Sequence, residues 1–474
     1  MLFNSFEFGV FLPIVFSIYW LLGYLGRKSQ NVFLVLASYV FYGWWDWRFL
    51  GLILASSLID YWIGGQIKAK PNHKKSLLLI SVVFNLGMLF VVKYYNFFID
   101  SFIASFSFLG YPLDLPELDW ILPVGISFYT FQTMSYTIDV YKGKMEPTRE
   151  LISFLAFVSF FPQLVAGPIE RAKNLLPQFY TKRTFDYASS VDGCRQILWG
   201  FFKKIVIADN CAAFVNPIFS NYDDSSGSSL LIASIFFAFQ IYGDFSGYSD
   251  IAIGTARLFG FKLSKNFAFP YFSRDIGEFW RRWHISLTTW FRDYVYIPLG
   301  GSKNKKLVTL RNVFIVFAVS GMWHGANWTF LVWGLINAVC FLPLILLDRN
   351  RRYLDEIEGN VPSFKTALQI LFTFSITVLA WVFFRSENIF QAVYILREIF
   401  SLSVLEAPAP VPLTLILLLL FFVVIEWLQK SKNHGLEIET DKTKRLLRWS
   451  IYLVVGLTIA WFGGAQEEFI YFQF

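Results

Sequence analysis

The stretch "SGMWHGANW", residues 320–328, separates two long apolar segments. The segment before it, Leu307 to Trp323, has 17 residues, and the one after it runs from about 327 to 347. At ~1.5 Å per residue, 17 helical residues extend about 25 Å, which is less than the ~30 Å hydrocarbon core of a bilayer. Basic residues flank the far ends of both segments. We therefore expect a short membrane hairpin that returns to the side it came from, with His324 at its tip.

The composition of the whole chain agrees with a membrane protein. Of its 474 residues, 55% are hydrophobic and only 16% are charged, whereas an ordinary soluble chain is about 25% charged. A soluble domain could not bury this much apolar surface around one core. Candidate spans of ~20 apolar residues lie near 7–26, 31–48, 49–66, 75–98, 121–140, 150–168, 195–219, 228–257, 307–323, 327–347, 364–384, 412–428 and 448–464. Several are short or interrupted, so we predict an all-α polytopic membrane protein with roughly eleven transmembrane helices plus re-entrant or interfacial helices.

The distribution of lysine and arginine predicts the orientation. These residues concentrate in 68–75, 348–352 and 430–448, and they are absent from 99–120 and from 406–412. Because positively charged loops stay in the cytoplasm, the pattern is consistent when both termini are extracytoplasmic. The net charge of +7 is then a topology signal. It does not indicate nucleic-acid binding, because no polar segment carries a basic stripe with interleaved aromatics.

Two further apolar stretches contain ionisable residues, which are costly in a membrane and usually face a cavity or a partner. Within "FQIYGDFSGYSDIAIG" (239–254), Asp244 and Tyr248 are candidates for substrate contacts, but a helix-packing network explains Asp244 equally well. Within "EFWRRWHISLTTWFRDYVYIPLGG" (278–301), a single helix would place Trp283 and His284 on one aromatic face. An interfacial amphipathic helix accounts for the arginines there but not for His284.

A metal site is not expected. The other two histidines, His73 and His434, fall in predicted cytoplasmic loops, and no H-E-x-x-H pattern occurs. The three cysteines are widely spaced and form no metal-binding or disulfide pattern, so they are interpreted as packing residues.

Several long motifs resemble one known family. They are "GISFYTFQTMSYTIDVYKG" (125–143), "FFPQLVAGPIERAKNLLPQF" (160–179), "YGDFSGYSDIAIGTARLFGF" (242–261), "FWRRWHISLTTWFRDYVYIPLGG" (279–301) and "GMWHGANWTFLVWG" (321–334). Together and in this order they resemble the membrane-bound O-acyltransferase family, in its bacterial alginate O-acetyltransferase branch. The resemblance implies a ring of tilted helices around a central funnel. It also implies one integral-membrane domain over 1–474, with the motif-bearing core at about 120–345 and C-terminal helices at about 364–464.

The resemblance also implies roles for individual residues. The family's invariant histidine matches His324, and its second position matches His284. Acyl transfer from a thioester to a hydroxyl needs a base, and a neutral imidazole suits that role. His284 would orient His324 or polarise the thioester carbonyl. Trp323 and Asn327 are additional candidates for substrate contacts, with Trp283, Asp244 and Tyr248.

The expected reaction moves an acyl group, in this branch acetyl, from a cytoplasmic thioester toward a hydroxyl of an extracytoplasmic polysaccharide. The donor is expected to be acetyl-CoA or an acyl carrier protein, with no permanently bound cofactor. The site would lie in the bacterial cytoplasmic (inner) membrane, among membrane lipid. Because the segments predicted outside are short, a separate extracytoplasmic acetyltransferase partner is expected to complete the transfer. The tail "FIYFQF" (469–474) and the outer loops are its expected docking surface, although a membrane-interface belt explains those aromatics equally well.

Two other functions remain open from the sequence. A transporter or flippase would use Asp244, His284 and His324 as a proton relay. A non-catalytic anchor would only recruit partners. Release of free thiol from an acyl thioester distinguishes the acyltransferase from both.

Overall fold

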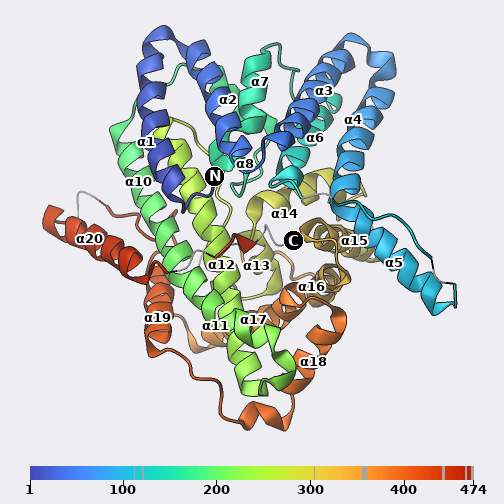
Figure 1. The fold of residues 1–474 in the computed structure, drawn as a ribbon, viewed down its shortest axis with the longest axis vertical. Helices are drawn as coiled ribbons and strands as arrows, with labels where there is room; N and C mark the ends of the chain where they lie inside the picture. The colour runs from blue at the N-terminus through green and yellow to red at the C-terminus, as the bar shows by residue number, and fades with distance from the viewer. Residues whose placement is uncertain are drawn as a thin grey trace. The chain divides into compact units, whose positions relative to one another are not determined.

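The computed structural model describes residues 1–111, 113–119, 122–303, 305–354, 359, 361–439, 443–464 and 467–470. Over these residues the chain forms helices joined by turns and loops, without a β-strand (Figure 1). The predicted all-α polytopic class is confirmed. Eight helices of the described chain are long and apolar enough to cross a membrane, and Leu413–Leu428 is a shorter apolar helix. This is fewer than the roughly eleven expected.

Part of this difference in the number of spanning helices arises where predicted spans are broken. The segment predicted at 195–219 forms α10 (Tyr187–Phe201) and α11 (Asp209–Ser220), joined by a wider π-type turn over Phe202–Ala208. The segment predicted at 150–168 forms α7 (Leu151–Ser159) and the single turn α8 (Phe161–Leu164). Pro162 has no backbone N–H to continue the ladder of α7, so the helix stops before it.

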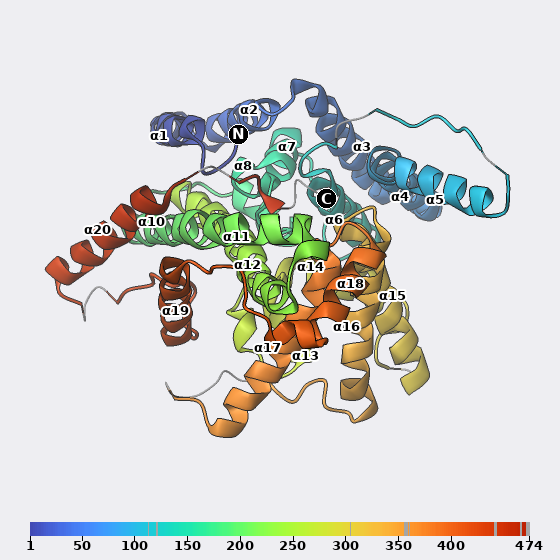
Figure 2. The same ribbon diagram turned by 60° about the horizontal axis from the view of Figure 1, so that its bottom comes forward.

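The chain packs as two compact units, Met1–Gly193 with Thr255–Ser264, and Cys194–Gly254 with Lys265–Phe474. The first unit contains α1 (Phe6–Leu21), α2 (Arg27–Gly43), α3 (Leu50–Ala69), α4 (Lys74–Leu89), α5 (Tyr95–Phe108), α6 (Ile126–Tyr141), α7, α8 and α9 (Ala172–Leu175). In it α3, α4 and α6 pack against one another (Figures 1 and 2). Buried Asp60 of α3 accepts hydrogen bonds from Ser81 and Asn85 of α4. This hydrogen-bond network holds the helices together as buried polar groups do in membrane bundles.

The second unit contains every residue proposed for the site. Its elements are the end of α10, then α11, most of α12 (Gly227–Leu258), α13 (Ile276–Arg282), α14 (Ile285–Phe291), α15 (Lys306–His324), α16 (Trp328–Leu346), α17 (Phe364–Arg385), α18 (Ile389–Ile399), α19 (Leu413–Leu428) and α20 (Arg445–Phe462). The helix α12 is 32 residues long and supplies Asp244 and Tyr248.

The predicted hairpin around residues 320–328 is present as α15 and α16, which lie side by side (Figures 1 and 2). Glycine allows this close packing: a Cβ atom at Gly321 would lie 2.3 Å from the carbonyl oxygen of Phe330, and one at Gly334 would lie 2.3 Å from that of Phe317. Small residues let membrane helices approach in this way. Each helix has 19 residues, about 28 Å, so α15 is slightly longer than expected. His324 is its last residue.

Candidate active site

His284 lies at a break between two short helices. Asp275 caps α13 by accepting a 2.7 Å hydrogen bond from the backbone N–H of Glu278, and α13 ends at Arg282. His284 then adopts the left-handed conformation, with φ of 43°, before α14 begins at Ile285. The expectation of one continuous helix with Trp283 and His284 on a shared face is therefore wrong. Local periodicity predicted a continuous helix, but the backbone of His284 is left-handed and interrupts the helix.

Neighbouring segments hold this unusual backbone. The backbone N–H of Ile285 donates to the carbonyl of Asn266 at 2.9 Å, and the N–H of Ala268 donates to the carbonyl of Arg282 at 2.9 Å. A left-handed non-glycine residue costs on the order of 1–3 kcal/mol and persists only where its surroundings determine it. Such residues cluster at functional sites, and here the strained position is one of the two histidines that the sequence singles out.

The His284 side chain is 1% exposed. Its Nδ1 lies 3.1 Å from Oδ1 of Asn266, and the ring of Phe245 meets it edge-on with ring centres 4.7 Å apart. The α13–α14 junction lies outside the helices long enough to span a membrane. Burial lowers the pKa of His284 to about 3, because the charged imidazolium is poorly solvated there. His284 is therefore neutral near pH 7.

His324 is 3% exposed and enclosed by aromatic rings. The centres of the Trp323, Trp333 and Phe384 rings lie 5.0, 5.1 and 5.4 Å from that of His324. The His284 and His324 ring centres are 6.4 Å apart, and we call these two residues the histidine pair. The structure thus brings together the two predicted catalytic residues in apolar surroundings that exclude water, where electrostatic and proton-transfer effects are strongest.

The remaining predicted residues divide into two groups. Trp323 joins the histidine pair, with its ring centre 5.9 Å from that of His284. Trp283 packs its ring on Trp381, with centres 5.0 Å apart, and so belongs to the aromatic core behind the pair. Asn327 caps α16 by accepting the N–H of Thr329, and its Nδ2 donates to the carbonyl of Glu387 at 2.7 Å. These bonds describe a structural role for Asn327.

Asp244 and Tyr248 lie in a different environment, which the sequence did not reveal. Nζ of Lys204 lies 2.8 Å from a carboxylate oxygen of Asp244 and 2.8 Å from one of Asp209, and we call these three residues the lysine cluster. Asp244 also accepts the backbone N–H of Ile470 at 2.6 Å. The packing-network interpretation of Asp244 therefore fits the contacts seen. The missed signal was a pair of lysines, Lys203 and Lys204, within the apolar segment 195–219.

The C-terminal tail also lies at this cluster. Phe469 is fully buried and Ile470 is 2% exposed. The Phe469 ring packs on that of Tyr248, with centres 4.3 Å apart. For these two residues the expectation of an exposed docking tail is wrong, because their apolar side chains pack inside the second unit. The rest of the predicted docking tail, 471–474, lies outside the described residues.

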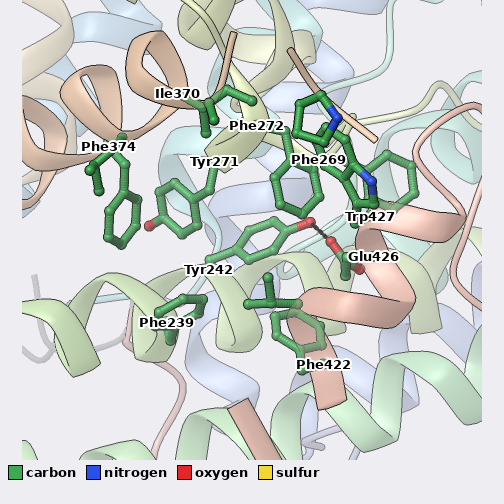
Figure 3. A pocket seen from close by; sticks show the side chains of 14 residues that line it. Phe239, Tyr242, Phe269, Tyr271, Phe272, Ile370, Phe374, Phe422, Glu426 and Trp427 are labelled. Carbon is green, nitrogen blue, oxygen red and sulfur yellow. Dashed lines mark hydrogen bonds between the residues drawn. The ribbon is translucent and has the colours of Figure 1, made fainter. Parts of the chain in front are cut away.

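An apolar cavity of about 340 Å³ lies between α12, α17 and α19, and the histidine pair does not line it (Figure 3). Tyr242 points toward Glu426 and donates a 2.5 Å hydrogen bond to its carboxylate. The rings of Tyr242 and Tyr271 also pack near Trp283, with ring centres 6.1 and 6.0 Å from that of Trp283. Among the described residues, no three His, Cys, Asp or Glu side chains are placed to hold a metal ion.

Comparison with known proteins agrees with the geometry. The profile of the membrane-bound O-acyltransferase family (MBOAT) matches residues 147–384, a region that contains both members of the histidine pair. This chain belongs to that family, and it is accordingly a membrane enzyme of the O-acyltransferase class.

Relatives within the family are named for different polymers. The chain is 41% identical to the probable alginate O-acetylase of Pseudomonas putida, over 84% of this chain and 79% of the relative. It is 36% identical to the peptidoglycan O-acetyltransferase of Helicobacter pylori, over 83% and 78% of the two chains. It is 28% identical to the teichoic acid D-alanyltransferase of Bacillus subtilis, over 57% and 71%. The acyltransferase alternative is thus supported over the transporter.

Proposed function

We propose that this protein transfers an acetyl group from a cytoplasmic thioester, across the bacterial inner membrane, toward a hydroxyl of an extracytoplasmic polysaccharide. The observation that carries the proposal is the histidine pair, two buried imidazoles 6.4 Å apart within aromatic walls. The names of the relatives support acetyl as the group and a polysaccharide as the acceptor. The donor is acetyl-CoA or an acyl carrier protein, and no bound cofactor is required.

The chemistry assigned to His324 is general-base catalysis. The acceptor hydroxyl loses its proton to an imidazole nitrogen of His324 as its oxygen attacks the thioester carbonyl. The new C–O bond forms, the C–S bond breaks, and the departing thiolate takes the proton from His324. Protons and electron pairs balance without a further reactant. The aromatic walls contribute by excluding water, which would otherwise hydrolyse the thioester.

The orientation assigned to the chain follows its charge pattern, with both termini extracytoplasmic. In this orientation α18 and the following turn lie outside. Their exposed apolar side chains include Phe390, Phe400 and Leu402, which are 87%, 72% and 82% exposed. We assign this surface to docking of an extracytoplasmic acetyltransferase that carries the acetyl group to the polymer. Its place next to the segment 406–412, which lacks lysine and arginine, favours the outer side.

The experiment uses purified protein in proteoliposomes, with acetyl-CoA or acetylated carrier protein inside and polysaccharide outside. We expect free thiol to be released inside, and the polysaccharide to be acetylated outside, and we expect both only when the partner transferase is added. Full acetylation by the chain alone would remove the partner from the proposal. If the wild-type protein left the thioester intact under all conditions, acyl transfer itself would be rejected.

A further inference from the structure

Asn266 lies against His284 and is 1% exposed. Its Oδ1 accepts the backbone N–H of Ser286 at 3.3 Å and the Ser286 hydroxyl at 2.9 Å. Its Nδ2 donates to the hydroxyl of Ser249 at 3.2 Å. The backbone carbonyl of the same residue accepts the N–H of Ile285. Asn266 is thus fixed by both its main chain and its side chain.

These bonds determine which way the amide points. A backbone N–H can only donate, so the Asn266 atom that faces the N–H of Ser286 must be the oxygen. The same oxygen lies 3.1 Å from Nδ1 of His284. An amide oxygen can only accept, so Nδ1 must carry the hydrogen. A neutral imidazole has one N–H, which leaves Nε2 of His284 without a proton.

We infer that Asn266 is a positioning residue that holds His284 in the Nδ1–H tautomer and so presents a bare Nε2 to the reacting groups. Within the described chain, Nε2 is buried and makes no hydrogen bond to protein. The inference rests on the proposed acyl transfer for its catalytic meaning, whereas the tautomer itself follows from the hydrogen bonds alone.

The tautomer separates the two roles expected of His284. A bare Nε2 accepts a hydrogen bond, and it cannot donate one to a thioester oxygen that becomes negative. It can stabilise His324 after that ring has taken the hydroxyl proton, as the acceptor of a base–orienter pair does. The ring centres are 6.4 Å apart, so the two imidazoles are close enough to act on the same reacting group. Donation to the oxyanion then falls to other N–H groups.

The direct test is ¹⁵N NMR of the full-length protein in detergent or nanodiscs, labelled in its imidazole nitrogens. The chain has four histidines, so single His→Gln variants assign the signals. We expect His284 to show a protonated Nδ1 and an unprotonated Nε2 in the wild-type protein. A protonated Nε2 in the wild type would overturn the inference, whether or not the protein acetylates anything. This measurement is therefore independent of the proposed function.

The kinetic test is Asn266→Ala, followed by thiol release from acetyl-CoA in the presence of the acceptor system. We expect kcat to fall about 10²-fold, the lower range for a misplaced acid–base group, with KM within about twofold. Replacing His284 by Nδ1-methylhistidine in the Asn266→Ala background fixes Nε2 as the bare nitrogen, and the smaller Ala leaves space for the methyl group. We expect this pair to recover most of the lost kcat. The Nε2-methyl isomer in the same background should recover nothing.

Asn337 provides the matched control. It is also a buried asparagine, and its Oδ1 accepts the indole N–H of Trp280 at 3.3 Å, but an indole has no second tautomer. Asn337→Ala should leave the ¹⁵N pattern of His284 unchanged, although it removes a similar hydrogen bond. Equal recovery with both methylhistidine isomers would reduce Asn266 to a packing role and contradict the inference.

Discussion

The histidine pair and the lysine cluster are two buried polar centres in the same unit, and they differ in how their charges and hydrogen bonds are satisfied. The histidine pair lies among aromatic rings, and His284 is neutral with Nε2 not hydrogen-bonded to the described protein. In the lysine cluster, Lys204 contacts Asp209, Asp244 and the carbonyl of Glu467, which accepts from Nζ at 2.9 Å. The histidine pair thus has a hydrogen-bond acceptor, Nε2 of His284, available for a ligand. The charges of the lysine cluster instead link separate segments of the chain.

The comparison shows that a buried ionisable residue in a membrane sequence is not by itself a catalytic one. In the sequence Asp244 resembled His284 and His324, as an ionisable residue in an apolar stretch. Their partners distinguish them. The charges of the lysine cluster are satisfied by close counter-charges, whereas the neutral imidazole of His284 uses one nitrogen in a hydrogen bond and has the other available for substrate. The first three predictions below test this division, and each changes one centre without the other.

The largest effect is expected for His324→Gln. Removal of the base should lower the rate of thiol release by about 10²- to 10⁴-fold. Gln is chosen because His324 is packed on three rings, and Ala would leave a cavity. The melting temperature of the purified variant serves as the control and should stay within a few degrees. A variant that folds normally and retains more than a tenth of the activity would show that the base is another group.

Lys204→Met should act on stability. It leaves Asp209 and Asp244 buried without their cation, and breaking a buried ion pair costs about 3–5 kcal/mol. The double variant Lys204→Met with Asp244→Asn should recover part of this loss, because it removes one unpaired charge. Denaturant or thermal unfolding in detergent measures both. If Lys204→Met were as stable as wild type yet inactive, the lysine cluster would belong to catalysis and the comparison would fail.

A smaller effect is expected from pH. The pKa of His284 is lowered from its ordinary 6.5 to about 3 by burial, so the unfolded chain binds a proton below pH 6.5 that the folded chain excludes. Stability from this residue is therefore complete above pH 6.5 and is lost as pH falls toward 3, by about 2 kcal/mol at pH 5. Thermal unfolding of wild type should weaken more between pH 7 and 5 than that of His284→Gln. Parallel pH profiles would mean that His284 is solvated or charged in the folded protein.

The smallest effect is expected at the proposed docking surface on α18, which belongs to neither buried centre. Replacing Phe390 and Leu402 by Ser should lower polymer acetylation about fivefold, the effect of losing a moderate interface anchor. Thiol release with a small soluble alcohol as the acceptor, which needs no docked partner, should not change. Leu446→Ser is the control, since Leu446 is also 81% exposed but lies beside a basic segment predicted to be cytoplasmic. If the wild type, the Phe390 and Leu402 double variant and Leu446→Ser acetylated the polymer equally, the partner would dock elsewhere.

Much of this architecture follows from hydropathy and spacing. The hairpin of α15 and α16 was predicted because two apolar segments flank a polar turn, and glycine spacing allowed their close packing. His324 and His284 were selected through the family motifs. Their proximity is a tertiary fact that connects residues 40 positions apart, and periodicity within one segment cannot report it.

The errors have equally specific causes. The helix break at His284 was missed because the local pattern is compatible with a continuous helix, and only the bonds from 266–268 fix the left-handed backbone. Asn266 itself was missed because an asparagine in a polar-looking stretch, "FKLSKNFAFP" (261–270), carries no chemical signature. Lys204 was overlooked because its segment met the length and hydropathy expected of a span.

The charges of the second unit also constrain how the protein enters the membrane during synthesis. Lys203 and Lys204 follow α10, whereas Asp244 and Asp250 belong to α12, and Lys203 lies 2.5 Å from Asp250. A ribosome delivers both lysines to the insertion machinery before Asp244 and Asp250 have been made, and only Asp209 lies in the same segment as the lysines. Each segment alone would carry uncompensated charge into hydrocarbon. We therefore expect the two segments to enter the bilayer together, after the second has been translated.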